Sequence, residues 1–338
     1  MANRSQTTLV GAQPPNLYRD LMRDLIIDGI SIGPGEHRIL ALSIARLPSG
    51  TEIDMPIHIY RSQHDGPTLL LSGGMHGDEV NGIEIVRKFL ESGLAKKLRR
   101  GSIVAVPIIN VYGFINFSRD VPDGKDVNRS FPGNPEGSLA SRVAYTLTRK
   151  ILPEIDFGLD FHTGGASRTN FPQIRFQEND ALGAEIAEAF AAPFTLYSNV
   201  IDGSLRATAQ DMGKCIVVFE GGETLRIDSK TVSEGVDGIR RTLKHFHMID
   251  KAPRQMHKRQ FFASSSWLRA DVSGLFRHKV GSGKAIHPGQ TLGYISSPTN
   301  EYSERLTSPY RGYIIGHNNF PLIHRGDALF HVGLLEDS

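Results

Sequence analysis

Residues 69–79 read LLLSGGMHGDE and join an apolar run to a pair of side chains that can bind a metal ion. The leucines predict a strand that stops at two glycines, and His76 and Glu79 follow three residues apart. An imidazole and a carboxylate both suit Zn²⁺. The spacing alone proves little, because a chain with 13 His contains about one His-x-x-Glu pair by chance. The pair gains its weight from its place between a strand and an amphipathic segment.

Two further apolar runs end in residues of the same chemical kind. Residues 155–165 read IDFGLDFHTGG, which places His162 at a strand end, with Asp160 on the same face two residues earlier, where it can orient an imidazole. Residues 215–219 read CIVVF and run into Glu220. Open α/β sheets carry their chemistry at the carboxyl ends of strands. Three ligands and a free carboxylate are the components of a catalytic zinc site with one open coordination position.

A loop without helical or strand periodicity lies between residues 109 and 139 and is rich in Gly, Pro, Asn and Asp. It contains the segment DVNRSFPG at residues 126–133, with Arg119 a short distance upstream. Long loops of this composition in compact domains are often functional. We therefore expect this loop to contribute to the same site.

These motifs, taken together and in this order, resemble those of the succinylglutamate desuccinylase/aspartoacylase family, relatives of the zinc carboxypeptidases. In that family a His-Gly-x-Glu pair and a later Asp-x-His supply the zinc ligands, and a Glu after a late strand is the general base. The resemblance implies one Zn²⁺ per chain bound by His76, Glu79 and His162. It also implies that Glu220 is the base.

The resemblance further implies how a substrate is held. Asn128 and Arg129 match the Asn-Arg pair that binds a substrate carboxylate, a task for which a planar guanidinium is suited. Arg119 matches an arginine that lies near the scissile carbonyl. The family also uses a tyrosine from the C-terminal domain, and three candidates remain open in this chain: Tyr302, Tyr310 and Tyr313.

Composition bounds the class of protein. The 338 residues include 38 basic and 36 acidic side chains, a formal charge of +2 that argues against nucleic-acid binding. The single cysteine, Cys215, excludes an intrachain disulfide framework and suits a reducing cytoplasm; at the start of an apolar strand it is expected to be a core residue. No apolar run is long enough for a membrane span or a signal peptide. We expect a soluble, cytoplasmic protein.

The order of apolar patterns predicts an α/β fold. Residues 1–60 predict an N-terminal leader and a hairpin at a sheet edge, with strands at 39–45 and 57–60. Helical spacing after residue 79 and over 139–151 alternates with strands at 102–109 and 157–161. Residues 1–250 are therefore expected to form a zinc-carboxypeptidase-like domain, with a mixed, largely parallel sheet flanked by helices.

A different pattern begins near residue 251, where two segments, 273–292 and 311–329, resemble each other. Such a repeat predicts a pseudo-symmetric β domain over residues 251–338. It resembles a biotinyl/lipoyl-type barrel, but residues 296–308, at the turn between its halves, contain no lysine for a carrier group. A lid or an oligomer contact is the expected role.

The leading interpretation is a zinc-dependent hydrolase of linear amides that removes an acetyl or succinyl group from a small N-acyl amino acid. N-acetyl-diaminobutyrate, N-acetylaspartate and N-succinylglutamate all fit the pattern, and the resemblance makes a homo-oligomer plausible. A zinc carboxypeptidase acting on peptides or cell-wall fragments shares the same metal ligands. A third interpretation, a binding protein that keeps the fold without catalysis, is disfavoured by the complete ligand set.

Overall fold

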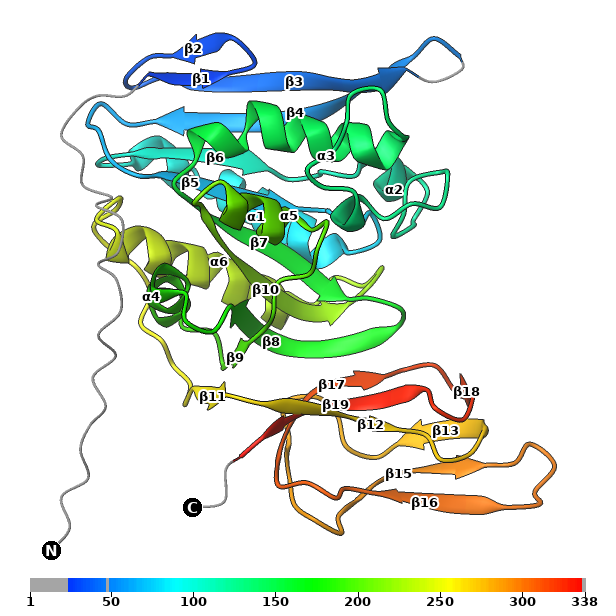
Figure 1. The fold of residues 1–338 in the computed structure, drawn as a ribbon. Helices are drawn as coiled ribbons and strands as arrows, with labels where there is room; N and C mark the ends of the chain where they lie inside the picture. Colours follow the sequence, from blue (N-terminus) through cyan, green and yellow to red (C-terminus); the bar gives the residue numbers. More distant parts are fainter. Residues whose placement is uncertain (1–23, 47–48, 336–338) are drawn as a thin grey trace, which may run out of the picture.

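A mixed thirteen-stranded sheet runs through the computed structural model, which describes residues 24–46 and 49–335 (Figure 1). Ten of its strands follow one another in the order β12-β19-β17-β8-β10-β7-β5-β6-β4-β3, and β9, β11 and β14 pair beside this path. The strands of this sheet are β3 (His37–Arg46), β4 (Glu52–Arg61), β5 (Thr68–Gly73), β6 (Ser102–Val106), β7 (Phe157–Gly164), β8 (Arg168–Phe176), β9 (Phe194–Tyr197), β10 (Cys215–Glu223), β11 (Gln260–Phe262), β12 (Ser265–Arg269), β14 (Ala285–Ile286), β17 (Gly312–Asn318) and β19 (Ala328–Leu334).

Four parallel strands, β6, β5, β7 and β10, make up the centre of the sheet. Leu71 of β5 is in register with Leu159 of β7, and Val217 of β10 is in register with the same residue. All three side chains are buried, as expected for strands covered by helices on both faces. Because parallel strands end at one edge, the residues that end β5, β7 and β10 come together.

Helices cover both faces of this centre. One core packs Leu69 and Leu71 against α1, α4 and α6, and the other packs Leu70 against α3 and α5, as the alternation of side chains along a strand requires. The helices are α1 (Val80–Glu91), α2 (Val111–Ile115), α3 (Leu139–Lys150), α4 (Ala181–Phe190), α5 (Leu205–Asp211) and α6 (Ser229–His245), with short 3₁₀ turns η1 (Leu94–Lys97), η2 (Val127–Arg129) and η3 (Leu152–Glu154).

Helix α1 lies unusually close to β7. A Cβ atom at Gly82 would lie 2.2 Å from the carbonyl oxygen of Phe161, so only glycine fits there. Glu79 is the N-cap residue of α1. The close packing therefore fixes the start of the helix, and with it Glu79, beside the end of β7.

The two ends of the sheet are antiparallel. Strands β3 and β4 form a hairpin at one edge, and residues 47–48 of its turn lie outside the described residues, as does the leader up to residue 23. Strands β1 (Leu25–Ile27) and β2 (Ile30–Ile32) form a separate antiparallel pair.

The C-terminal region is built from β strands, as the repeat predicts. Besides its share of the large sheet it forms a four-stranded sheet of β13 (Gly274–His278), β15 (Thr291–Ser296), β16 (Ser303–Thr307) and β18 (Leu322–Ile323). The short strand of each repeat unit pairs with the long strand of the other, β14 with β17 and β18 with β13. The main sheet continues across residue 250, because β17 pairs with β8. The boundary at 250 and the barrel likeness stay predictions.

The expected fold class is confirmed. Helices flank a mixed sheet whose centre is parallel, and a β region follows at the C-terminus. Within residues 24–46 and 49–335, no helix combines the length and the apolar character that crossing a membrane requires.

Candidate active site

The three predicted metal ligands meet at the carboxyl ends of β5 and β7. His76 follows β5, Glu79 caps α1 and His162 lies in β7, and one potential ligand atom from each lies within 4.8 Å of the others. His76 Nδ1 is 2.6 Å from Glu79 Oε1, and His162 Nδ1 is 2.9 Å from Glu79 Oε2. All three side chains are buried. Two imidazoles and one carboxylate, buried and close together, fit the donor set of a catalytic zinc ion.

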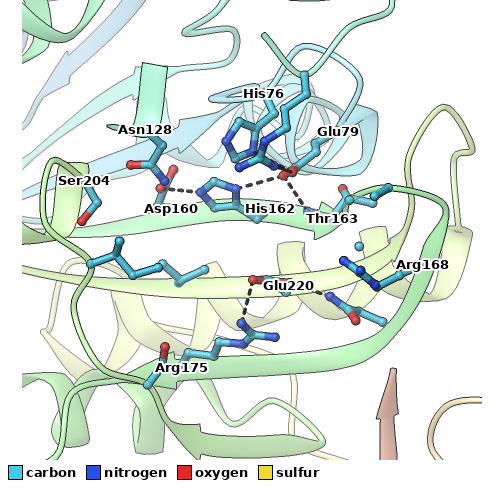
Figure 2. A pocket seen from close by; sticks show the side chains of 18 of the residues that line it. His76, Glu79, Asn128, Asp160, His162, Thr163, Arg168, Arg175, Ser204 and Glu220 are labelled. Atoms are coloured by element: carbon cyan, nitrogen blue, oxygen red, sulfur yellow. Dashed lines mark hydrogen bonds and ion pairs between the residues drawn. The ribbon is translucent and has the colours of Figure 1, made fainter. Parts of the chain in front are cut away.

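Further hydrogen bonds fix the orientation of this cluster (Figure 2). His162 Nε2 is 2.8 Å from Asp160 Oδ2. The Ser72 hydroxyl donates to the other oxygen of Asp160 at 2.7 Å. The backbone N–H of Thr163 donates to Glu79 at 2.9 Å. Asp160 therefore makes the contact with the His162 imidazole that its place on the strand predicts.

The proximity of opposite charges governs ionisation in the cluster. Burial disfavours charge on Glu79, but His76 and His162 outweigh it and hold the pKa of this carboxyl far below its usual range. Burial likewise opposes protonation of His162, yet Asp160 and Glu79 raise its pKa well above the usual value. The cluster is thus built to keep a carboxylate ionised between two imidazoles.

Arg119 and Asp126 reach the cluster from the loop before α3. Arg119 Nη2 donates to Asp126 Oδ2 at 2.8 Å, and Arg119 Nη1 lies 3.5 Å from Glu79 Oε1. Asp126 Oδ1 is 3.3 Å from His76 Nε2. Asp126 was not assigned a role from the sequence, although it opens the segment that contains Asn128. Its position three residues before a candidate substrate arginine was the available signal.

Asn128 and Arg129 also reach the cavity, in different ways. The side-chain oxygen of Asn128 accepts a hydrogen bond from the backbone N–H of Leu205 at 2.9 Å, which ties the loop to the start of α5. Arg129 is exposed, and its Nη1 donates to the carbonyl oxygen of Asn128 at 2.6 Å. Both residues thus line the cavity: Arg129 presents a cation there, and Asn128 also holds the loop against α5.

Glu220 lies beside the cluster on β10, where its backbone is in register with His162. Its carboxylate contacts the opposite neighbour, β8: Oε1 is 3.1 Å from Arg175 Nη1, and Oε2 accepts from Asn170 Nδ2 at 2.5 Å. Glu220 could be predicted from its place after an apolar strand, whereas Arg175 and Asn170 could not, because nothing in the sequence pattern of β8 sets them apart.

A cavity of about 470 Å³ opens in front of these residues. Its wall includes all the predicted site residues, together with Arg168, Arg175 and Arg206, and two residues from the C-terminal region, Trp267 and His331. The rings of Trp267 and His331 stack 4.4 Å apart, and Arg168 lies over the tryptophan. Burial, with the charges of Arg175 and Arg168, lowers the pKa of His331 to about 3, so this imidazole is neutral.

The tyrosine candidates lie elsewhere. The Tyr310 hydroxyl accepts from Ser266, the Tyr302 hydroxyl donates to the backbone of Ser273, and the Tyr313 ring packs against Phe194 and Phe262. None of the three lines the cavity. Cys215 is buried, as expected, and its thiol donates to Asp180.

Comparison with known proteins identifies the family to which the chain is similar. Residues 65–246 match the model of the succinylglutamate desuccinylase/aspartoacylase catalytic domain. Over 292 residues the chain is 30% identical to the N-alpha-acetyl-L-2,4-diaminobutyric acid deacetylase of Halomonas elongata, which covers 82% of each chain.

Solved structures show the same fold. A succinylglutamate desuccinylase/aspartoacylase from Rhodobacter sphaeroides has a TM-score of 0.76 at 27% identity, covering 88% of this chain and 94% of the other. The product-bound ectoine utilization protein EutE from Ruegeria pomeroyi has a TM-score of 0.78 at 24% identity, covering 89% and 95%. The fold is thus that of the zinc-carboxypeptidase-like deacylases. The chain belongs to the succinylglutamate desuccinylase/aspartoacylase family.

The turn between the candidate ligands His76 and Glu79 depends on Gly77. A Cβ atom there would lie 1.9 Å from the carbonyl carbon of Gly113 in α2. Gly77→Ala is therefore expected to cost about 2 kcal/mol of unfolding free energy through overpacking and to weaken metal binding. Thermal unfolding and a metal titration measure the two effects. Gly281→Ala, whose nearest neighbour would be at 3.8 Å, is the control; equal effects of both variants would contradict the prediction.

Proposed function

We propose that the protein is a zinc-dependent deacylase that hydrolyses the amide bond of a small N-acyl amino acid. The observation that carries the proposal is the convergence of His76, Glu79 and His162 on one point of a cavity that also contains Glu220. Family membership supports amide hydrolysis, and the Halomonas relative is named for deacetylation of an acyl amino acid. Candidate substrates are N-acetyl-diaminobutyrate, N-acetylaspartate and N-succinylglutamate.

His76, Glu79 and His162 would hold a zinc ion, which would polarise the amide as a Lewis acid and lower the pKa of a water. In the proposed reaction Glu220 accepts a proton from the attacking water and passes it to the leaving amine. Asp160 keeps His162 in one orientation through the hydrogen bond to Nε2. The products are the free acyl carboxylate and the amino acid.

Two arginines act on the substrate in this proposal. Arg119, beside Glu79 and His76, donates to the oxygen on which charge develops, a contribution of a few kcal/mol for a well-placed donor. Arg129, with Asn128, binds the substrate carboxylate and orients the amide. Arg119 is already close to the ligand cluster, whereas Arg129 reaches in from the exposed rim.

The walls of the cavity favour a small substrate over a peptide. A volume of about 470 Å³ suits an acylated amino acid, and Trp267 and His331 bring the C-terminal region to the wall. A carboxypeptidase requires an open groove at this place. From the lone cysteine and the family we also propose a cytoplasmic location and a homo-oligomeric assembly.

Amine release from a panel of N-acetyl and N-succinyl amino acids, with a blocked dipeptide alongside, tests the proposed function. The zinc-loaded protein is expected to prefer one acyl amino acid over the dipeptide. Preference for the dipeptide would assign the protein to the carboxypeptidases, and inertness toward the whole panel would favour a binding protein.

Zinc binding depends on the cluster. We expect one zinc ion per chain in the purified protein and less than a tenth of that in His162→Ala, because two ligands cannot replace a three-ligand site. Elemental analysis after dialysis measures the stoichiometry. His324→Ala, at an exposed turn, is the control. Full zinc content in His162→Ala would remove this residue from the ligand set.

Glu220→Gln is expected to retain zinc while kcat falls by about 10²–10⁴, the usual contribution of a general base. Steady-state amine release, measured with elemental analysis of the same sample, separates the two effects. Glu178→Gln, an exposed carboxylate on the loop after β8, is the matched control. Full turnover in Glu220→Gln would exclude the base role.

Arg129→Ala is expected to raise KM about 10- to 100-fold with a smaller change in kcat, because it removes a charge-assisted contact to the substrate carboxylate. Initial rates over a range of substrate concentrations give both constants. Lys125→Ala removes an exposed cation from the same loop and should leave KM near its original value. An unchanged KM in Arg129→Ala would place the carboxylate elsewhere.

A further inference from the structure

Both oxygens of the Glu220 carboxylate are bound by donors on the side away from the metal ligands. Arg175 and Asn170, which hold them, belong to β8, the antiparallel neighbour of β10. The metal-ligand cluster lies across the other neighbour, β7. Figure 2 shows the Glu220 carboxylate turned toward Arg175, below His162. The carboxylate is therefore held in an orientation that does not serve the cluster.

A general base must come within hydrogen-bond reach of the proton that it accepts. For Glu220 this means leaving Arg175, since the 3.1 Å ion pair directs the carboxylate to β8. The pair is well shielded: the side chains of Arg175 and Glu220 are 21% and 17% exposed. Shielding from water strengthens an ion pair. Arg175 therefore needs another anion as its partner before the Glu220 carboxylate can turn away from it.

A second arginine, Arg206, lies near Arg175, and the pair of cations indicates that the replacement partner is an anion. Arg206 of α5 lines the same cavity and donates to the Ser198 carbonyl oxygen at 3.0 Å. Within the described part of the chain it has no ion-pair partner. Burial lowers the pKa of this guanidinium and the charge of Arg175 acts in the same direction, while Cys215, Asp180 and Asp160 act in the opposite direction. Two neighbouring cations at a cavity wall, with one carboxylate between them and the metal site, favour an additional anion.

We propose that Arg175 is a positioning residue that holds Glu220 away from the metal ligands until an anionic group of the substrate takes its place against Arg175 and Arg206. This inference rests on the proposed deacylase function. The anionic group is a second carboxylate, on the acyl chain or on the amino-acid side chain, besides the one that Arg129 binds. Its arrival satisfies both guanidinium groups and frees Glu220 to turn toward β7.

Because the substrate carboxylate replaces Glu220 at Arg175, this arginine determines substrate specificity through kcat. A substrate with the second carboxylate compensates Arg175 as Glu220 leaves. A neutral substrate of the same shape must separate the ion pair without compensation, so its kcat is lower even when it is fully bound. If Arg175 only stabilised the fold, its substitution would change kcat for both substrates alike.

The test uses pairs of substrates that differ only by a carboxylate and its amide, N-succinyl against N-succinamoyl amino acids and acyl-glutamate against acyl-glutamine. The zinc-loaded protein is expected to turn over the acidic member of at least one pair with a kcat about tenfold higher, the scale of one charge-assisted hydrogen bond. In Arg175→Gln the difference is expected to shrink to about twofold, because kcat for the neutral member rises.

Arg168→Gln is the matched control, since it removes one cation from the same cavity and makes no ion pair with Glu220 in the structure. It should keep the kcat preference of the unmodified protein. The proposal is overturned if the unmodified protein has no preference in kcat, if Arg175→Gln lowers kcat equally for both members, or if Arg168→Gln abolishes the preference as Arg175→Gln does.

Binding of succinate to the metal-free protein, followed by calorimetry, tests the anion subsite without catalysis. Affinity is expected to fall about tenfold in Arg206→Gln, and equal affinities in the unmodified protein and this variant would overturn the proposal. If no acyl amino acid is hydrolysed, the proposed function fails by itself, and the succinate titration still decides whether the two arginines bind an anion.

Discussion

The carboxylate of Glu79 is the point on which the site depends. Its two oxygens lie against His76 and His162 and accept the backbone N–H of Thr163, so one side chain joins the end of β5 to the end of β7. With 2% of its surface exposed, it cannot exchange these partners for water. A buried carboxylate needs compensating charge and hydrogen bonds, and the two imidazoles provide them. Glu79 also stands at the start of α1, and the loop that contains Asp126 reaches the same cluster through the contacts of Asp126 with His76 and of Arg119 with Glu79.

The part of the site around Glu79 could be predicted from the sequence because two local patterns suffice for it. Apolar runs mark the central strands, and parallel strands bring their carboxyl ends to one edge. His76, His162 and Glu220 each stand at such an end, so their proximity follows from the fold class alone. Asp160 follows from the alternation of side chains along β7. The family resemblance then supplied roles that spacing does not determine.

The wall of the cavity formed by β8 and the C-terminal region could not be predicted, because it depends on pairing between strands that are far apart in the sequence. Arg175 and Asn170 reach Glu220 only because β8 turns back and pairs antiparallel with β10, and a register shift between Glu220 and Gly222 decides which side chains meet. Trp267 and His331 arrive from strands far along the chain, through the continuation of the sheet from β8 into β17. Short, alternating segments of this kind do not reveal their partners in a single sequence.

The two walls differ in charge, and this difference bears on the substrate. His76, Glu79, Asp160 and His162 lie on the side of β5 and β7, and Arg168 and Arg175 lie on β8; five arginines, against three carboxylates, line the cavity as a whole. A bound zinc ion would add to the positive charge. A substrate with a free amine in its side chain would meet like charges at several points, each of which disfavours binding in a site partly shielded from water. A substrate with two carboxylates would instead neutralise cations of the cavity wall, notably Arg206, which has no ion-pair partner among the described residues. If the protein hydrolyses acyl amino acids as proposed, this arrangement of charge would favour the acidic ones among them.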